Sequence, residues 1–582
     1  MPARNKTPQD SQDLAATTRT DPITGSIIQG LLENIAIEMG YKLMRMSYSS
    51  IIRESEDFGA AICDAQGRQL CECSKSTPLQ SGPIPGYVRG IKRQLEARGQ
   101  VIEPGDVILH NDPYNGASHS PDIGVCLPIF HADELIGFAV TTAHHLDIGS
   151  CQPGSVGVVK CVDSYAEGLQ LRALKAYEAG VRNDTVWQMI ADNVRVPDLV
   201  IGDLEAQVSA CRTGVERMLE VVEEYGLKTV QDAVEDLFDY SERLMRSAIA
   251  EIPDGIYDAV GFVDGYSDSD DPALKNLKIK VTLTIKGDDL DVDLEGTAEQ
   301  LSGHAINMPF HGTVDVAIWL TLRSVLLDSD RFGPIPQNDG LIRPITIRAP
   351  KGTIANPEFP APTIARFAPG NVLADTVMHA LAKAVPEQVS AGVANLKAIT
   401  FSGIKDNQQW VHIEIFEGSY GGRYQKDGMA SVDTLYANTR NNPIEDIESH
   451  VPLRVHRYEY RENFGGAGRW RGGANSIKEI EFLEDGVLSV EGDGHGRAPW
   501  GLLGGNPGEP SALILNPDHN GGIALPSMMT SRTMRASDRV LAIGGIGGGY
   551  GNPAERDRAA VLADIEDELI DRETAMRDYN IA

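Results

Sequence analysis

Side chains suited to metal binding gather within residues 110–149. The stretch carries three imidazoles and two carboxylates that are candidates, namely His119, Asp122, His144, His145 and Asp147. Nitrogen and hard oxygen donors of this kind bind divalent first-row metals without a thiolate. A single histidine is more often a core or surface residue, but a convergent group is harder to obtain by accident. We therefore expect a metal site here.

The elements around these residues predict how they come together. Val125–Phe130 and Leu135–Thr142 are apolar runs with strand character, joined by a turn at 131–134. Antiparallel pairing about residue 133 sets Asp122 opposite His144, so one hairpin brings distant donors close. His145 or Asp147 are candidates to orient the ligand imidazoles. Three protein ligands would leave a coordination position open, which is the catalytic arrangement.

Composition limits the class of protein. The chain has 582 residues, 42% of them hydrophobic and 23% charged, which predicts a globular protein of several lobes. Its formal net charge of −31 argues against nucleic acid and against anionic membrane surfaces as partners. No window has about 18 uninterrupted apolar residues, so no membrane span is expected. Residues 1–22 are polar and lack the apolar core of a secretory signal, which predicts a flexible arm.

The cysteines indicate a reducing compartment. There are seven, irregularly spaced, and none forms a CxxC pair. Cys71 and Cys73 are too close for an ordinary disulfide. Reduced thiols in a cytoplasm are the simplest interpretation, with Cys126 a small buried hydrophobe of the hairpin.

Periodicity predicts a mixed α+β, multi-lobed fold. It has an N-terminal α/β metal-binding lobe, a helical middle and β-rich C-terminal lobes. The expected helices are Pro22–Met46, 83–94, Leu199–Tyr225, Val230–Ile249 and Asn371–Val385, and the expected strands include Val107–His110, Asn276–Ile285 and Asp289–Leu294. The predicted division is 1–22 (arm), 23–252 (metal hairpin and helices), 253–400 (meander and helix), 401–552 (Gly-rich β lobe) and 553–582 (helical tail).

Other motifs carry little chemistry. The glycine-rich segments 465–473 and 544–551 miss the GxGxxG spacing, and no GxxxxGK[ST] occurs, so tight turns are the favoured interpretation and no ATP site is expected. No GxSxG elbow is present. Polar residues that are candidates to line a substrate pocket, although each is more often structural, are Asp112, Asn307, Arg366, Tyr420, Arg423 and Asn438.

Several blocks together resemble the hydantoinase B/oxoprolinase B-subunit family. They are DFGAAICDAQG (57–67), NDPYNGASHSPDIG (111–124), AHHLDIG with PGS (143–155), PAPTIARF (360–367), NNPIEDIESHVPLRVHRYEYRENFGGAGRWRGG (441–473) and GGGYGNPAER (547–556). The resemblance runs from about Asp21 to Arg556. Departures are small: Ser118-His119-Ser120 and Gly149-Ser150 stand where the family often has Thr-His-Leu and Gly-Gly.

The resemblance implies a hetero-oligomer with two copies of each subunit. Members work with an A-type ATPase subunit, which binds ATP and Mg, and they open cyclic amides such as hydantoins, 5-oxoproline or lactams. In a related branch, which carboxylates ketones, the metal ligands match His119, Asp122 and His144 here. A divalent metal (Zn, Mn or Fe) would then activate the attacking water, with His145 or Asp147 as the catalytic base that takes its proton.

The sequence favours the B-type subunit of a cytoplasmic, ATP-dependent cyclic-amide hydrolase. One alternative is a subunit of an ATP- and bicarbonate-dependent ketone carboxylase of the acetone or acetophenone type, whose subunits are longer. The other is a non-catalytic scaffold with a structural metal. An open coordination position beside a pocket would count against the scaffold, and full coordination by all five candidate residues would count for it.

Overall fold

The computed structural model describes residues 18–433, 435–519 and 521–581. Its first sheet is antiparallel, with seven strands in the order β2-β1-β5-β4-β3-β6-β7. These strands are β1 (Phe58–Asp64), β2 (Gln69–Glu72), β3 (Val107–His110), β4 (Asp122–His131), β5 (Glu134–His144), β6 (Leu174–Glu178) and β7 (Val181–Arg182). The β4–β5 hairpin pairs Asp122 with His144 and His131 with Glu134, which confirms the predicted register.

Alternate residues of the hairpin face two cores, as the period of two along a strand requires. Cys126 and Val140 pack with α4 (Ile84–Ala97) in a small core on one face. Val125 and Ala139 belong to the largest core on the other face. Cys126 is fully buried, as expected, and all seven cysteines are free.

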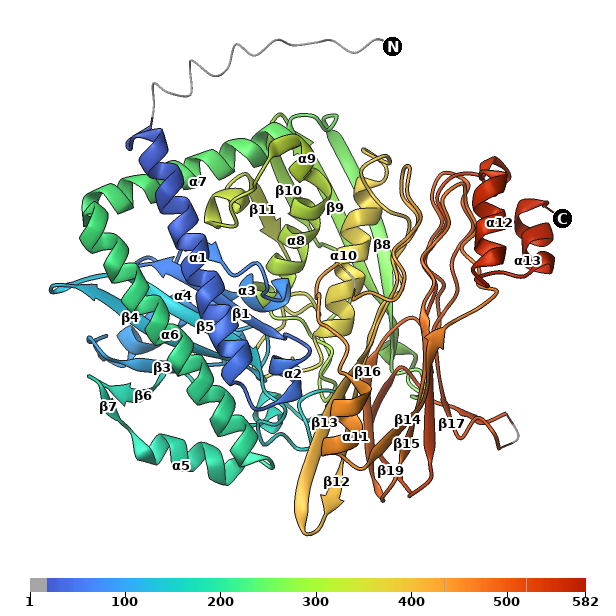
Figure 1. Cartoon of the computed structure of the whole chain (residues 1–582), viewed down its shortest axis with the longest axis horizontal. Coiled ribbons are helices and arrows are strands. Elements are labelled where there is room, and N and C mark those ends of the chain that lie inside the picture. Colours follow the sequence, from blue (N-terminus) through green and yellow to red (C-terminus); the bar gives the residue numbers. More distant parts are fainter. Residues whose placement is uncertain (1–17, 434, 520, 582) are drawn as a thin grey trace.

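Long helices cover the face opposite α4. They are α1 (Pro22–Met46), α5 (Asp184–Asn193) and α6 (Pro197–Tyr225), and α1 and α6 lie lengthwise against each other (Figure 1). Helix α7 (Leu227–Ile249) packs on α1 and α6 rather than on this sheet. The helix predicted over Pro22–Met46 is confirmed, with Asp21 accepting a capping bond from the Thr24 amide at 3.0 Å. Of the predicted N-terminal arm, residues 1–17 lie outside the described residues, whereas Arg19 pairs with Asp236 of α7 at 3.0 Å.

The second sheet has the order β11-β10-β9-β8, with only the β10–β11 pair parallel. Its strands are β8 (Gly255–Gly265), β9 (Lys275–Lys286), β10 (Asp289–Asp293) and β11 (Ile345–Arg348), and α10 (Phe367–Leu381) packs on β8 and β9. Helix α10 begins and ends four residues earlier than predicted. Pro369 lies in its first turn, where a missing amide hydrogen is tolerated, and tight turns follow Leu381.

The third and fourth sheets stack face to face (Figure 1). The third has the order β13-β12-β16-β19 and the fourth β14-β15-β20-β17-β18, and all their pairs are antiparallel. Their strands are β12 (Lys397–Lys405), β13 (Gln408–Phe416), β14 (Leu453–Tyr460), β15 (Ser476–Phe482), β16 (Gly486–Gly492), β17 (Ala512–Leu515), β18 (Ile523–Ala524), β19 (Met528–Met534) and β20 (Arg539–Ile543). The predicted division at 400/401 therefore falls inside β12.

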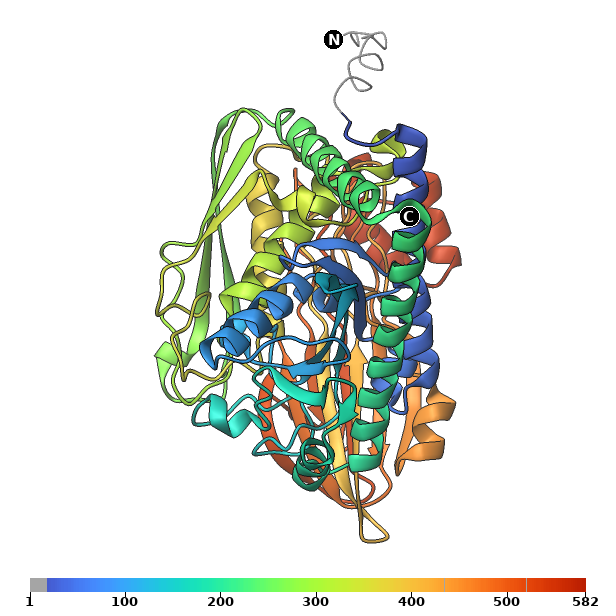
Figure 2. The same cartoon turned by 90° about the vertical axis from the view of Figure 1, so that its left-hand side faces the viewer.

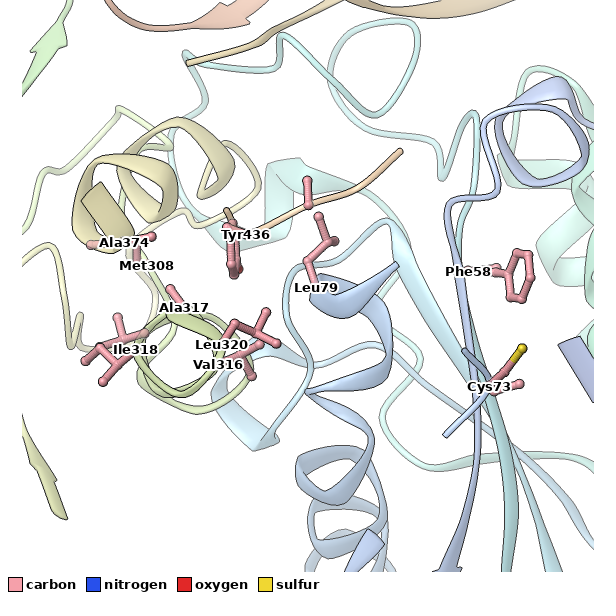
Figure 3. Close-up of a cluster of buried hydrophobic side chains, with 14 of the residues drawn as sticks. Phe58, Cys73, Leu79, Met308, Val316, Ala317, Ile318, Leu320, Ala374 and Tyr436 are labelled. Atoms are coloured by element: carbon pink, nitrogen blue, oxygen red, sulfur yellow. The ribbon is translucent and has the colours of Figure 1, made fainter. Parts of the chain in front are cut away.

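Shorter helices connect these layers. They are α2 (Ser50–Arg53), α3 (Pro78–Ser81), α8 (Asp315–Leu326), α9 (Ser329–Phe332), α11 (Ile444–His450), α12 (Arg558–Glu566) and α13 (Arg572–Tyr579). Figure 2 shows the second sheet standing at the edge away from α1 and α6. Leu79, Ala317, Leu320 and Tyr436 belong to the largest core, part of which Figure 3 shows. No described helix has the length and apolar character to cross a membrane.

Candidate metal centre

The foot of the β4–β5 hairpin brings three metal-ligand groups together. Asp122 is the first residue of β4, His144 is the last of β5, and His119 lies in the loop before β4. One donor atom from each lies within 4.8 Å of the others, and all three side chains are buried. The hairpin register positions two of them, and the tight approach loop adds the third.

Hydrogen bonding fixes the tautomer of His119. Its Nδ1 lies 2.7 Å from the carbonyl oxygen of Ile364, which can only accept, so Nδ1 carries the proton. The lone pair on Nε2 is left 3.0 Å from Oδ1 of Asp122. This buried Nε2 has no hydrogen-bond partner among the described residues.

His144 is oriented in the same sense. The Ser155 hydroxyl donates to the carbonyl of His145 at 2.6 Å, so its oxygen accepts from Nε2 of His144 at 2.8 Å. Nδ1 of His144 then faces Oδ1 of Asp122 at 3.0 Å. The bond to Ile364 thus leaves Nε2 of His119 facing Oδ1 of Asp122, and the bond to Ser155 leaves Nδ1 of His144 facing the same oxygen.

Asp122 is held as a carboxylate by cationic and polar neighbours. Arg366 lies 2.9 Å from Oδ2, the Ser118 hydroxyl also bonds Oδ2, and Gln80 donates to Oδ1 at 2.8 Å. Although burial opposes it, the hydrogen bond from Nδ1 of His144 and the positive charge of Arg366 keep the pKa of Asp122 well below its ordinary value. Burial lowers the pKa of His119 to about 4, as a neutral nitrogen ligand requires.

These residues fit a divalent cation. Two imidazole nitrogens and one carboxylate oxygen face one another, and the orphaned Nε2 of His119 has no other use in the described structure. Asp122 raises the pKa of His144 against the effect of burial, so a proton would sit on Nδ1 of His144 when no cation is bound. A metal would displace that proton.

The two residues expected to act as catalytic base lie elsewhere. His145 directs Nε2 to Gln207 of α6 at 3.0 Å, and neither it nor Asp147 belongs to the group of three. Asp147 pairs with Arg195 at 2.8 Å and accepts from the amides of Gly149 and Gly154 at 3.2 Å. Through these contacts, Asp147 holds the conformation of the loop that follows β5.

A small, mainly apolar cavity opens beside the three ligand groups. We call it the inner cavity; its walls are Ile51, Asp57, Leu79, His119, His144, Val156, Arg366, Phe367, Leu396, Ala398, Ile413, Ile415, Ala437, Thr439 and Glu491. It lies between the first sheet and the third, whose strands β12, β13 and β16 supply four of these residues. The metal centre therefore sits at the junction of two sheets far apart in sequence.

The structure separates the six residues expected to bind substrate. Only Arg366 lines the inner cavity. Asn307 bonds backbone groups of Leu301 and Pro362, and Asp112 caps the turn at 113–115 and pairs with Arg172 at 3.2 Å. The Tyr420 hydroxyl accepts from the Leu435 amide, while Arg423 and Asn438 are exposed.

The sequence analysis did not single out two carboxylates that line the inner cavity, Asp57 and Glu491. Burial raises the pKa of Asp57 to about 6 and that of Glu491 to about 7. Asp57 stands at the head of the block DFGAAICDAQG, so its position was available as a signal, whereas nothing near Glu491 distinguishes it in the sequence. Carboxyl groups with such values can exchange protons near neutral pH.

Glu167 holds the backbone segment whose carbonyl orients His119. Its Oε1 accepts from the amides of Thr363 and, at 2.7 Å, Ile364. The carbonyl of Ile364 is the group that fixes His119. Burial raises the pKa of Glu167 to about 8.

The fold and site define a class: a multi-sheet α+β protein with a buried His-Asp-His group at an internal cavity. The model of the hydantoinase B/oxoprolinase family matches residues 21–553, and the chain belongs to that family. A Pseudomonas sp. (strain NS671) protein, provisionally named as the B-type subunit of a D-/L-hydantoinase, is 59% identical, with 97% of this chain and 95% of that protein covered.

Two solved structures share the architecture. The ATP-dependent caprolactamase of Pseudomonas jessenii matches with a TM-score of 0.86 and 28% identity, over 97% of both chains. A nucleotide-free acetone carboxylase structure matches with a TM-score of 0.88 at 19% identity, over 98% of this chain and 81% of that one. The second likeness shows the fold alone.

Proposed function

We propose that this chain is the B-type subunit of an ATP-dependent cyclic-amide hydrolase and carries its metal centre. The observation that carries the proposal is the convergence of three lone-pair donors at a cavity that also holds two carboxylates. Membership of the family and the likeness to a subunit named for hydantoinase support it. ATP and Mg belong to an A-type partner, and hydantoins, 5-oxoproline or lactams are the substrate class.

The chemistry explains why ATP and a metal would be coupled. An amide carbonyl is a poor electrophile, and transfer of the γ-phosphoryl group of ATP to its oxygen would open its carbon to attack by water. Loss of the ring nitrogen as the amine would then leave an acyl phosphate, which a second water would hydrolyse to the acid and phosphate. A divalent metal held by His119, Asp122 and His144 supplies Lewis acidity and lowers the pKa of water toward 7. The products are the ring-opened acid, ADP and phosphate.

The chain's own residues take the remaining roles. Arg366, locked on Asp122 at 2.9 Å and over the Tyr436 ring at 5.7 Å, places a fixed positive charge at the cavity wall for developing negative charge. Asp57 and Glu491 line the same cavity and are better placed than His145 or Asp147 to accept and return a proton. The apolar walls exclude bulk water from the activated substrate.

The two alternatives have less support. A scaffold with a structural metal would use all five candidate ligands, but His145 and Asp147 have other partners. The ketone carboxylase alternative has the shared fold in its favour. The acetone carboxylase chain is longer, since only 81% of it is covered.

One experiment separates these functions. The chain is purified with its partner ATPase, analysed for metal, and given ATP with a cyclic-amide panel or with ketones and labelled bicarbonate. We expect bound metal and ring-opened acids that depend on ATP. Label fixed into a β-keto acid would instead assign the carboxylase function, and bound metal with neither product would favour the scaffold.

A further inference from the structure

A second hollow adjoins the inner cavity on its outer side. We call it the vestibule; its walls include Ser50, Arg53, Leu146, Leu199, Val411 and His450. It lies between the N-terminal lobe and the β12–β13 hairpin and is the larger of the two hollows. It is open to solvent, whereas the metal-ligand side chains are buried.

At three places in the chain, a residue that lines the vestibule lies within one or two positions of a residue that lines the inner cavity. In α2, Ser50 and Arg53 line the vestibule and Ile51 lines the inner cavity. After β5, Leu146 lines the vestibule, two residues beyond His144. Along β13, Val411 lines the vestibule and Ile413 the inner cavity, and these two residues share one strand face.

Apolar side chains separate the two hollows. Ile51, Leu146 and Ile413 each line one of them, and their exposed fractions are 1%, 3% and 1%. Helix α2 is a single turn that Arg53 ties to Asp446 of α11 at 2.8 Å, and its Ile51 and Ile52 are anchored in the largest core. The Ile51 side chain, rather than the helix, is therefore the part that can move aside, by a change of rotamer.

Another hollow also approaches the inner cavity. It is lined by Val260, Val372, Asn395 and Trp500, among others. Asn395 lines it next to Leu396 of the inner cavity, and Asp493 lines it two residues after Glu491, so the two hollows are neighbours at two places against three for the vestibule. This hollow therefore serves as the competing route in the test.

We infer that the vestibule is the entrance to the metal centre and that Ile51 on α2 is the barrier small ligands must pass. This inference rests on the metal centre of the proposed function. An apolar wall favours small, uncharged ring compounds over ionised ones, because a charged group loses its hydration there. Ile51 is thus a residue that selects substrate by size and charge.

The test loads the full-length chain with Co²⁺ and follows the entry of imidazole, a small ring compound kept neutral by a pH above its pKa, through the change in Co²⁺ absorbance in a stopped-flow instrument. Ser50→Trp and Leu199→Trp fill the vestibule, and each should slow association roughly tenfold because access becomes limiting. Ile51→Ala should speed it. Val260→Trp, in the competing hollow, is the control and should leave the rate unchanged.

The equilibrium affinity for imidazole and the circular dichroism spectrum accompany each rate. Slower association with unchanged affinity in both vestibule variants supports the entrance. Unchanged rates in both, or slowing by Val260→Trp instead, would overturn it while leaving the metal centre intact. Failure of the unsubstituted chain to bind Co²⁺ would overturn the metal centre and the entrance together.

Discussion

His119 and His144 owe their free nitrogens to groups that are remote in sequence or structure. The Ile364 carbonyl accepts a hydrogen bond from Nδ1 of His119. The Ser155 hydroxyl donates to the His145 carbonyl and therefore accepts a hydrogen bond from Nε2 of His144. Neither arrangement is visible in the spacing of the histidines. At the residue scale, the site is therefore prepared for a cation by its hydrogen-bond partners as much as by its ligands.

Loss of one ligand should empty the site and leave the fold intact. We expect His119→Ala and His144→Ala to lower metal affinity by more than about a hundredfold, since each removes one of three donors. Metal content by mass spectrometry and circular dichroism measure the two effects. His131→Ala, at the other end of the same hairpin, is the control, and stoichiometric metal in either ligand variant would contradict the assignment.

Substitutions of Glu167 test whether this residue positions His119 through the backbone of Ile364. Glu167→Ala frees the amides of Thr363 and Ile364, so the carbonyl that orients His119 loses its position, and metal affinity should fall about tenfold. Glu167→Gln keeps the accepting oxygen and matches the neutral form that burial favours, so it should bind metal normally. Competition with a chelator measures both, and equal affinities in the two variants would refute the role.

At the scale of elements, the hairpin was predictable and the loops were not. Strict apolar runs about a short turn set the β4–β5 register, and with it the pairing of Asp122 with His144. The loop around Asp433, in contrast, could not be predicted from the sequence. Its Asp433 binds the amides of Asn438 and Thr439 at 2.9 and 2.7 Å, which places Thr439 at the inner cavity although Asn438 points to solvent.

We expect the ionised carboxylate of Asp433 to lower the free energy of unfolding at neutral pH. Burial raises the pKa of its carboxyl to about 7, so the folded state binds the proton more tightly than the unfolded state, whose ordinary value is 3.8. Stability should therefore fall as pH rises from about 4 to 7. Asp433→Asn keeps the accepting oxygen and replaces Oδ1, which has no partner among the described residues.

We expect Asp433→Asn to raise the melting temperature by on the order of 2 °C at pH 8, with the gain shrinking toward pH 5. Scanning calorimetry across that range measures it. The exposed Asp406→Asn in the β12–β13 turn serves as a control without a gain. A gain that is independent of pH would contradict the charge argument.

At the scale of the whole molecule, the candidate metal centre lies where the first sheet meets the third. The largest core continues across that junction, from Ile51 and Ile123 to Ala398 and Ile413. The chain thus builds one enclosed site from two lobes. Its sequence has no P-loop, and its glycine-rich segments 465–473 and 544–551 run into isolated bridges and turns, as the pairing of Trp470 with Tyr550 shows.

This organisation predicts that ATP turnover needs the partner. The purified chain should show no ATPase activity above background, and adding the A-type subunit with a cyclic amide should produce ADP. Coupled-enzyme detection of ADP measures both states. Robust ATP hydrolysis by the purified chain would contradict the division of labour.

Sequence determined the local parts of this protein. Helix α1, the β4–β5 register and the nearness of Asp122 to His144 follow from capping and periodicity, which act over a few residues. Tertiary structure alone decided that Glu491 and Ile413 close the cavity, that Arg366 locks on Asp122, and that His145 and Asp147 face away from it. Those contacts join segments from 48 to 244 residues apart, and no local pattern records which loops meet.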